Sequence, residues 1–314
     1  MRQKSLALLQ TSYRQYGIAA YNVFNLEQIL GVFKGANDST NPVLFQLTPY
    51  AHKYVGFDAL ISTIDIVSKT YPNVDFGIHL DHGTPEACLY ALEENLDFDS
   101  IMIDLSHESF ARNVTGTREI VQLAHRKGIS VEAELGVLSG TEDELSVDAT
   151  HTRFTDPNMA QQFIEQTDCD SLAISVGTSH GAYKFASGDS LNLPLIAEIA
   201  SSIPNVPLVL HGASKVDIQE IDRINKTGGQ LDSKAACGLK NEDLQASFKL
   251  GIAKVNIATD IRLLWTRVHR EHFQKSPENI DPVVPGQTFI DTLAKFVAKK
   301  QFIMNPKLQG KIDE

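Results

Sequence analysis

The chain has 314 residues and a mass of 34.6 kDa, which fits two or three average domains or one α/β barrel with insertions. Its 42% hydrophobic and 21% charged residues are typical of a globular protein and exclude a disordered, collagen-like or coiled-coil chain. Lys and Arg number 28 against 39 Asp and Glu, a net charge of −11, which excludes non-specific binding to nucleic acid or to an anionic membrane.

Eight short apolar or β-branched runs recur along the chain and predict strands. They cover residues 18–24, 42–47, 75–80, 100–105, 129–135, 171–176, 207–210 and 252–257. Amphipathic stretches of helical period lie between them, for example at 56–71, 85–96 and 116–128. Eight strand–helix repeats favour a closed (β/α)₈ TIM barrel, an α/β fold, with extra C-terminal helices. The alternative is an open Rossmann sheet, but no GxGxxG motif follows the first strand.

The chain is interpreted as one domain, residues 1–314, because no linker or low-complexity tract divides it before Pro282. We expect the barrel at about 17–268 and a helical extension at about 269–314, with helices predicted over 263–281 and 287–303. The segment 226–245 is too polar and glycine-rich for one helix, and is interpreted as an active-site insertion or an oligomer contact.

The cysteines and the N-terminus bear on the cellular compartment. Cys88, Cys169 and Cys237 lie far apart without a CxxC pair, which favours buried thiols over disulfides or a cysteine zinc site. The N-terminal apolar run is too short for a signal peptide, and no stretch reaches 18 uninterrupted apolar residues. A cytoplasmic protein with no membrane segment is expected.

Three histidines follow predicted strands and precede glycine: His82, His180 and His211. The carboxyl ends of barrel strands meet at one mouth, where the chemistry of this fold takes place. Three imidazoles with an open coordination position form a catalytic zinc site, in which the metal polarises a carbonyl or activates water. The alternative is that each ring is hydrogen-bonded in the core or at a helix cap.

Carboxylates accompany these histidines. Asp81 directly precedes His82, so in an extended strand their side chains point to opposite sides, and only a turn brings both to the mouth. A carboxylate beside a metal-bound substrate suits proton transfer, whereas the alternative role is a turn or helix N-cap. The polar segment 136–157, with Glu142 among its acids, either closes over a substrate or is a plain surface loop.

Three glycine-containing or polar turns after the last strands have backbone N–H groups that suit a phosphate. They contain Gly181 with Lys184, Gly212 with Ser214, and Asn256 with Thr259. Each turn alone is a weak signal. Together, and in register with the histidines, they indicate a phosphorylated small molecule as the ligand.

The motifs HLDHG, IDLS, VEAELG, GTSHGAYKF, LVLHGAS and KVNIATD, from about Ala19 to Arg262, resemble in order those of the class II zinc-dependent ketose-bisphosphate aldolases. The resemblance implies a lyase of glycolysis and gluconeogenesis that reversibly cleaves fructose 1,6-bisphosphate into glycerone phosphate and glyceraldehyde 3-phosphate. It also implies a catalytic Zn²⁺, a monovalent cation (Na⁺ or K⁺) beside the phosphate, and a homodimer or homotetramer.

The resemblance assigns roles to individual residues of this chain. The metal ligands that it implies are His82, His180 and His211, with Glu134 and Asp104 near an alternative or second metal position. Asp81 would take the proton from the C4 hydroxyl, and Glu142 would protonate the resulting enediolate. The substrate-binding residues that it implies are Asn22, Gln46, Thr48, Gly181, Lys184, Gly212, Ser214, Asn256, Thr259 and, at the distal phosphate, Arg262.

Two positions depart from the family pattern. Ala258 stands where fructose-type members usually have Asp and tagatose-type members have Ala, so tagatose 1,6-bisphosphate or another ketose phosphate is the alternative substrate. Thr48 and Pro49 replace the family's usual Ser and Glu. Against these departures, the 226–245 insertion is similar to that of the fructose-bisphosphate branch.

Three further interpretations compete with a metal-dependent aldolase. A zinc-dependent barrel hydrolase would usually have an HxH pair on its first strand, and this chain has none there. A Schiff-base aldolase would use Lys254 or Lys184, but Lys254 begins the last predicted strand and is expected away from the mouth. A non-catalytic sugar-phosphate binding protein is the third possibility, and a turnover assay separates it from both enzymes.

Overall fold

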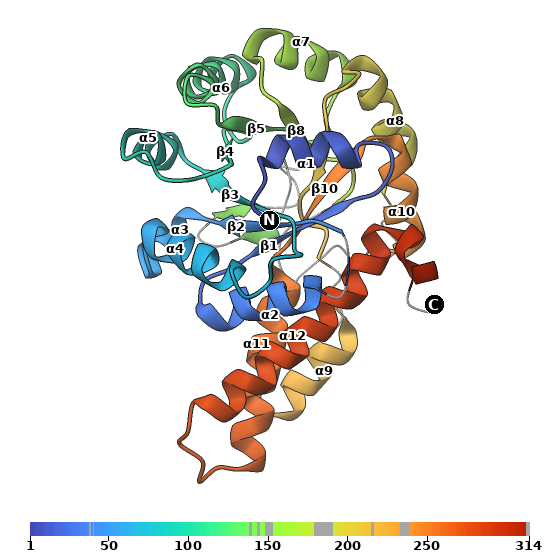
Figure 1. Cartoon of the computed structure of the whole chain (residues 1–314). Helices are drawn as coiled ribbons and strands as arrows, with labels where there is room; N and C mark the ends of the chain where they lie inside the picture. The colour runs from blue at the N-terminus through green and yellow to red at the C-terminus, as the bar shows by residue number, and fades with distance from the viewer. Residues whose placement is uncertain are drawn as a thin grey trace.

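The computed structural model describes residues 1–37, 39, 41–137, 140–142, 145–147, 153–178, 191–214, 217–232 and 239–311. Within these residues, parallel strands close a barrel in the order β1, β10, β9, β8, β5, β4, β3, β2 (Figure 1). Their bounds are Ile18–Asn22 (β1), Val43–Leu47 (β2), Phe76–Gly83 (β3), Ser100–Ile103 (β4), Ser130–Leu135 (β5), Ser171–Ile174 (β8), Leu208–Leu210 (β9) and Ile252–Ile257 (β10). The predicted strands and the TIM barrel are confirmed.

Helices surround the barrel as the periodicity predicts. They are α1 (Ser5–Ser12), α2 (Leu26–Asn37), α3 (Pro49–Tyr54), α4 (Phe57–Ser68), α5 (Pro85–Glu93), α6 (Phe110–His125), α7 (Pro157–Thr167), α8 (Leu193–Ser202), α9 (Ile218–Lys226), α10 (Asn241–Leu250), α11 (Thr259–Lys275) and α12 (Val283–Met304). A 3₁₀ helix, Pro306–Lys311, follows, and a hairpin of β6 (Gly140–Glu142) and β7 (Leu145–Val147) lies after β5.

The strands are apolar on both faces because each face is covered. Outward side chains pack under the helices: the ring centroid of Phe33 on α2 lies 4.6 Å from that of Phe45 and 5.2 Å from that of Phe76. Inward side chains at the N-terminal end form a separate apolar cluster, which includes Leu9 of α1 and Ile18. The barrel interior is therefore a packed core at this end, and polar side chains concentrate toward the other.

The N-terminal segment closes the end of the barrel where the strands begin. Figure 1 shows α1 lying across the barrel. Just before α1, Arg2 donates hydrogen bonds to the carboxylates of Asp65, Asp97 and Asp99, and Asp99 also accepts from the backbone N–H of Ile78 on β3. These contacts leave the opposite end, where the strands finish, as the end that can admit a ligand.

The C-terminal helices differ in their bounds from the prediction. The helix predicted over 263–281 runs from Thr259 to Lys275, since it begins directly after β10 and Pro277 disfavours helix at the residue before it. The helix predicted over 287–303 begins earlier, at Val283, because its first turn tolerates Pro285. In the part of the chain that is described, no helix combines the length and apolarity needed to span a bilayer.

Helix α12 returns along α2 and α11 and joins the extension to the barrel (Figure 1). Close packing against α2 requires glycine, because a Cβ atom on Gly35 would lie 2.3 Å from the carbonyl oxygen of Ala294. Cys88 and Cys169 are buried and free, as expected for structural thiols, whereas Cys237 lies outside the described residues.

Candidate active site

Polar side chains from several strands meet at the end of the barrel where the strands finish. They come from Asn22 on β1, Gln46 on β2, Asp81 and His82 on β3, Asp104 after β4, Glu134 on β5, His211 after β9 and Asn256 on β10. Most of them are buried, although few polar side chains are found in a protein core without a partner or a function. These residues lie together at the strand ends, and their roles stay predictions.

A distortion of β3 brings two neighbouring side chains to the same side. His82 has φ +46°, in the left-handed region that few non-glycine residues adopt, and the pairing of β3 with β4 shifts register between Leu80 and Gly83. This bulge supplies the turn that the sequence requires, so Asp81 and His82 both contribute to one cluster of polar groups. Backbone strain of this kind is concentrated at functional sites.

Two amides hold the Asp81 carboxylate in place. Nδ2 of Asn22 donates to Oδ2 at 2.7 Å, and Nδ2 of Asn256 donates to Oδ1 at 2.9 Å. The side-chain oxygens of both asparagines and the whole Gln46 amide are buried with no hydrogen-bond partner among the described residues. Such unsatisfied groups indicate a ligand or water in the barrel mouth, beside a carboxylate whose orientation is fixed.

The histidines and carboxylates bring potential metal-ligand atoms together. One group is Asp81, His82 and His211, and a second is His82, Asp104 and Glu134; within each, the ligand atoms lie within 4.8 Å of one another. Nδ1 of His82 donates to Oδ2 of Asp104 at 2.8 Å, and Nδ1 of His211 lies 3.2 Å from Oε2 of Glu134. Imidazole nitrogens with carboxylate oxygens are the ligands that zinc binds, so the residues present fit such an ion.

The same contacts set the charges of the cluster. Burial and the neighbouring His82 lower the pKa of His211, but its contacts with Glu132 and Glu134 outweigh them and raise that pKa to about 9. Burial opposes ionisation of Asp104, yet the hydrogen bonds from His82 and from the Ser106 backbone hold its pKa well below the usual range. Asp104 is thus ionised and balances positive charge beside His82.

A second polar layer lies below this cluster, and sequence reasoning missed its role. Nζ of Lys254 donates to both oxygens of Glu132, at 2.9 and 2.8 Å, and to Nε2 of His79 at 3.1 Å. Nε2 of His211 lies 3.0 Å from the same Glu132 carboxylate. Burial and the charge of Lys254 lower the pKa of His79 to about 3, so its ring is neutral. We call these three residues, Lys254, Glu132 and His79, the buried triad.

A signal for the triad was present in the strand periodicity. Residues two apart on a strand share a face, and His79, Glu132 and Lys254 each precede a site residue by two positions. The expectation that Lys254 lies away from the mouth agrees with its place at this deeper level of the barrel. Its ammonium group is fully buried and its three donors are all used, which disfavours a Schiff-base nucleophile.

The turns expected to bind phosphate are partly described. Gly212 has φ +60°, Oγ of Ser214 accepts from the backbone N–H of Ala258 at 3.2 Å, and Thr259 is the first residue of α11. Arg262 follows on the same helix, with its guanidinium carbon 4.9 Å from the ring centroid of Phe24. These segments follow β9 and β10 directly, at the same end of the barrel as Asp81.

Several predicted residues lie elsewhere or outside the description. The Thr48 hydroxyl accepts from the backbone N–H of Ala51 and so caps α3, a structural role that accompanies its predicted place near substrate. His180, Gly181 and Lys184 lie outside the described residues. Glu142 ends β6, and its side chain is likewise outside the description, but backbone pairing of Val137 with Arg153 ties the base of this segment together.

Comparison with known proteins agrees with this geometry. The model of the family "Fructose-bisphosphate aldolase class-II" matches residues 4–307. A fructose-bisphosphate aldolase from Thermus caldophilus is 40% identical over 268 residues, covering 85% of this chain and 86% of its own, and one from Nostoc sp. is 41% identical over 288 residues, covering 85% and 79%.

Solved structures share the fold. A protein from Coccidioides immitis described as a fructose-1,6-biphosphate aldolase has a TM-score of 0.80 and 26% identity, covering 98% of both chains. The YdjI aldolase from Escherichia coli K12, at 24% identity and TM-score 0.77, covers 98% of this chain and 100% of its own, and supports the fold alone. From its sequence and its site, the chain belongs to the class II fructose-bisphosphate aldolase family.

Proposed function

We propose that this protein is a metal-dependent lyase that reversibly cleaves fructose 1,6-bisphosphate into glycerone phosphate and glyceraldehyde 3-phosphate. The observation that carries the proposal is the Asp81 carboxylate, held by Asn22 and Asn256 beside the cluster of His82 and His211. Removing a proton from a hydroxyl requires an oriented base, and stabilising the resulting negative charge requires positive groups beside it. An oriented carboxylate next to grouped imidazoles meets both requirements.

The proposed metal site rests on its potential ligand atoms, which are imidazole nitrogens and carboxylate oxygens. His82 and His211, with His180 as a third ligand, would hold Zn²⁺, and Glu134 and Asp104 would line an alternative or second position. When bound, Zn²⁺ would act as a Lewis acid toward the ketose oxygens and so stabilise the negative charge that develops as the carbon–carbon bond breaks. A monovalent cation, Na⁺ or K⁺, would lie beside the phosphate.

The chain's own residues would move the protons. Asp81 takes the proton of the C4 hydroxyl, the electrons of that O–H bond form the aldehyde carbonyl, and the electron pair of the breaking C3–C4 bond passes to the three-carbon fragment as its enediolate. Asn22 and Asn256 keep the carboxylate aimed during this step. Glu142, on the segment after β5, returns a proton to the three-carbon product at C3. Microscopic reversibility makes the same groups serve condensation.

The remaining residues would bind substrate. Gln46 and Thr48 line the sugar side, where the Gln46 amide has no partner among the described residues. Gly181, Lys184, Gly212, Ser214 and Thr259 would bind the phosphate of the glycerone half, and Arg262 the distal phosphate through its planar guanidinium.

Assembly into a homodimer or homotetramer is also proposed. The turn between α11 and α12, which Figure 1 shows projecting from the barrel, exposes Ile280 and Val283, and exposed apolar side chains of this kind favour an interface between subunits.

Substrate preference is the first test. Ala258 has only a methyl group, so it offers no hydrogen bond with which to distinguish the two C4 configurations of fructose and tagatose 1,6-bisphosphate. Losing a specific hydrogen bond to a hydroxyl changes discrimination by one to several orders of magnitude. We expect Ala258→Asp to shift the ratio of kcat/KM values toward the fructose substrate at least tenfold, by roughly the energy of one hydrogen bond.

The measurement is the cleavage rate of both bisphosphates by parent and variant, with glyceraldehyde 3-phosphate as the detected product. Asp at this position is also a better N-cap than Ala for α11, which lacks a side-chain cap, so the variant should be no less stable than the parent. A ratio that Ala258→Asp leaves unchanged would remove this residue from substrate selection. Failure of the parent to cleave either bisphosphate would contradict the proposed function itself.

A further inference from the structure

We infer that the buried triad of Lys254, Glu132 and His79 positions His211 for metal binding, and that Lys254 is a positioning residue of the active site rather than only a core residue. The inference deepens the proposed function and rests on it. It concerns residues that contact neither substrate nor metal, and it assigns a purpose to an ion pair in the middle of the barrel.

The first step is the cost of the ion pair. Lys254 and Glu132 are at most 2% exposed, and desolvating two charges costs more than an isolated pair usually returns. An apolar pair of similar volume would fill this space with less loss of solvation energy. The presence of the ion pair is therefore not explained by stability, and its contact with His211 offers an explanation.

The second step is the orientation of the ring. The Lys254 ammonium group has only donors, so His79 accepts through Nε2 and donates through Nδ1 to Oγ of Ser100, 2.7 Å away. The Glu132 carboxylate has only acceptors, so the His211 atom that contacts it, Nε2, carries a proton. Nδ1 of His211 is then the nitrogen that faces Glu134 and the metal-ligand cluster.

The third step is what Lys254 contributes. It donates to both oxygens of Glu132 and so fixes the orientation of the carboxylate. In this orientation, Oε1 of Glu132 accepts a hydrogen bond from Nε2 of His211. Without the lysine, Glu132 loses two hydrogen bonds and its ammonium counter-charge, and only its contact with His211 is left to hold the carboxylate in place. Mutating the outer-shell partners that orient a ligating histidine typically lowers metal affinity 10–100-fold. Loss of Lys254 should act through the same partner, Glu132.

The test compares zinc affinities measured by competition with a chromophoric chelator. We expect Lys254→Met to weaken Zn²⁺ binding by about 10–100-fold. The double variant Lys254→Met/Glu132→Gln should regain most of this loss, because the Gln oxygen still accepts from His211 while its amide faces Nε2 of His79, which lies 3.8 Å from Oε2 of Glu132. The variant carries no unpaired charge.

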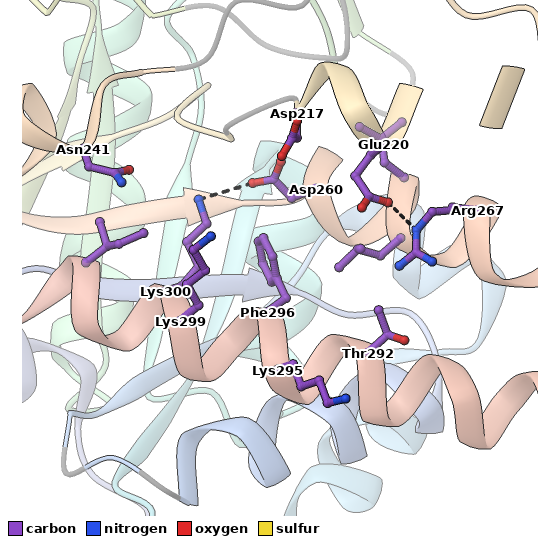
Figure 2. Close-up of a pocket in the computed structure, with 13 residues that line it drawn as sticks. Asp217, Glu220, Asn241, Asp260, Arg267, Thr292, Lys295, Phe296, Lys299 and Lys300 are labelled. Atoms are coloured by element: carbon purple, nitrogen blue, oxygen red, sulfur yellow. Dashed lines mark hydrogen bonds and ion pairs between the residues drawn. The ribbon is translucent and has the colours of Figure 1, made fainter. Parts of the chain in front are cut away.

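A matched control comes from another buried lysine. Nζ of Lys300 on α12 lies 3.5 Å from Oδ2 of Asp260, in a cavity of about 330 Å³ between the C-terminal helices (Figure 2). Lys300→Met removes a buried, ion-paired ammonium group outside the barrel interior. Its thermal unfolding should show a comparable loss of stability, but its zinc affinity should equal that of the parent.

The outcomes separate the inference from the proposed function. A parent protein that does not bind zinc contradicts the metal site itself. A parent that binds zinc, with Lys254→Met binding equally well, overturns the positioning role, and so does a double variant no better than the single one. If Lys254→Met does not fold, the zinc affinity of the double variant tests the inference by itself. The inference requires the double variant to bind zinc nearly as well as the parent.

Discussion

Replacing Asp81 by alanine should lower kcat for fructose 1,6-bisphosphate cleavage by about 10²–10⁴-fold while zinc remains bound, because general-base catalysis contributes an effect of this size. Asn22 and Asn256 hold the carboxylate and orient it, so no other acid in the described cluster takes its place without a rearrangement. The measurement pairs steady-state kinetics with zinc content determined on the same sample.

Asp58→Ala serves as the control, since Asp58 is an exposed residue in the first turn of α4, and its rate should match the parent. An Asp81→Ala protein with a normal rate would remove Asp81 from proton transfer. Loss of zinc together with the rate would instead make Asp81 a metal ligand, as its place in the first ligand group permits.

Replacing His211 by alanine should abolish both metal binding and cleavage. His211 is fully buried between Glu132 and Glu134, and its removal takes away the ring that contacts both carboxylates. Because outer-shell changes already cost 10–100-fold in affinity, loss of the ligand itself should cost at least about 100-fold. Zinc affinity and kcat/KM measured in parallel check this.

His125→Ala is the matched control. His125 also pairs with a carboxylate, Asp170, at 2.8 Å, but it ends α6 outside the candidate site. Zinc affinity that survives in the His211 variant would exclude His211 as a ligand, whereas an equal loss in the His125 variant would show that the effect is one of folding.

The barrel could be predicted from the sequence because each of its strands is covered on both faces. A strand such as Val43–Leu47 is a nearly continuous apolar run, and the polar residue that interrupts it, Gln46, is a proposed substrate-binding residue. The position of the candidate site could likewise be predicted from the polar residues at strand ends, since a polar side chain that follows an apolar strand has few structural reasons to lie there.

Other features of the fold and the site depend on tertiary contacts and could not be predicted from the sequence. The left-handed φ of His82 depends on the register shift between β3 and β4, which no local pattern specifies. The close packing of α12 against α2 depends on Gly35, whose partner Ala294 lies far along the chain. The partners of Lys254 lie 122 and 175 residues away, so only closure of the barrel brings them within hydrogen-bond distance.

The most direct test of a metal-dependent aldolase is cleavage of fructose 1,6-bisphosphate by the full-length protein before chelation, after chelation and after zinc is restored. We expect activity to disappear on metal removal and to return with Zn²⁺, and borohydride to trap no covalent adduct on Lys254. Cleavage that survives complete metal removal, or a borohydride-trapped lysine, would contradict the metal-dependent mechanism.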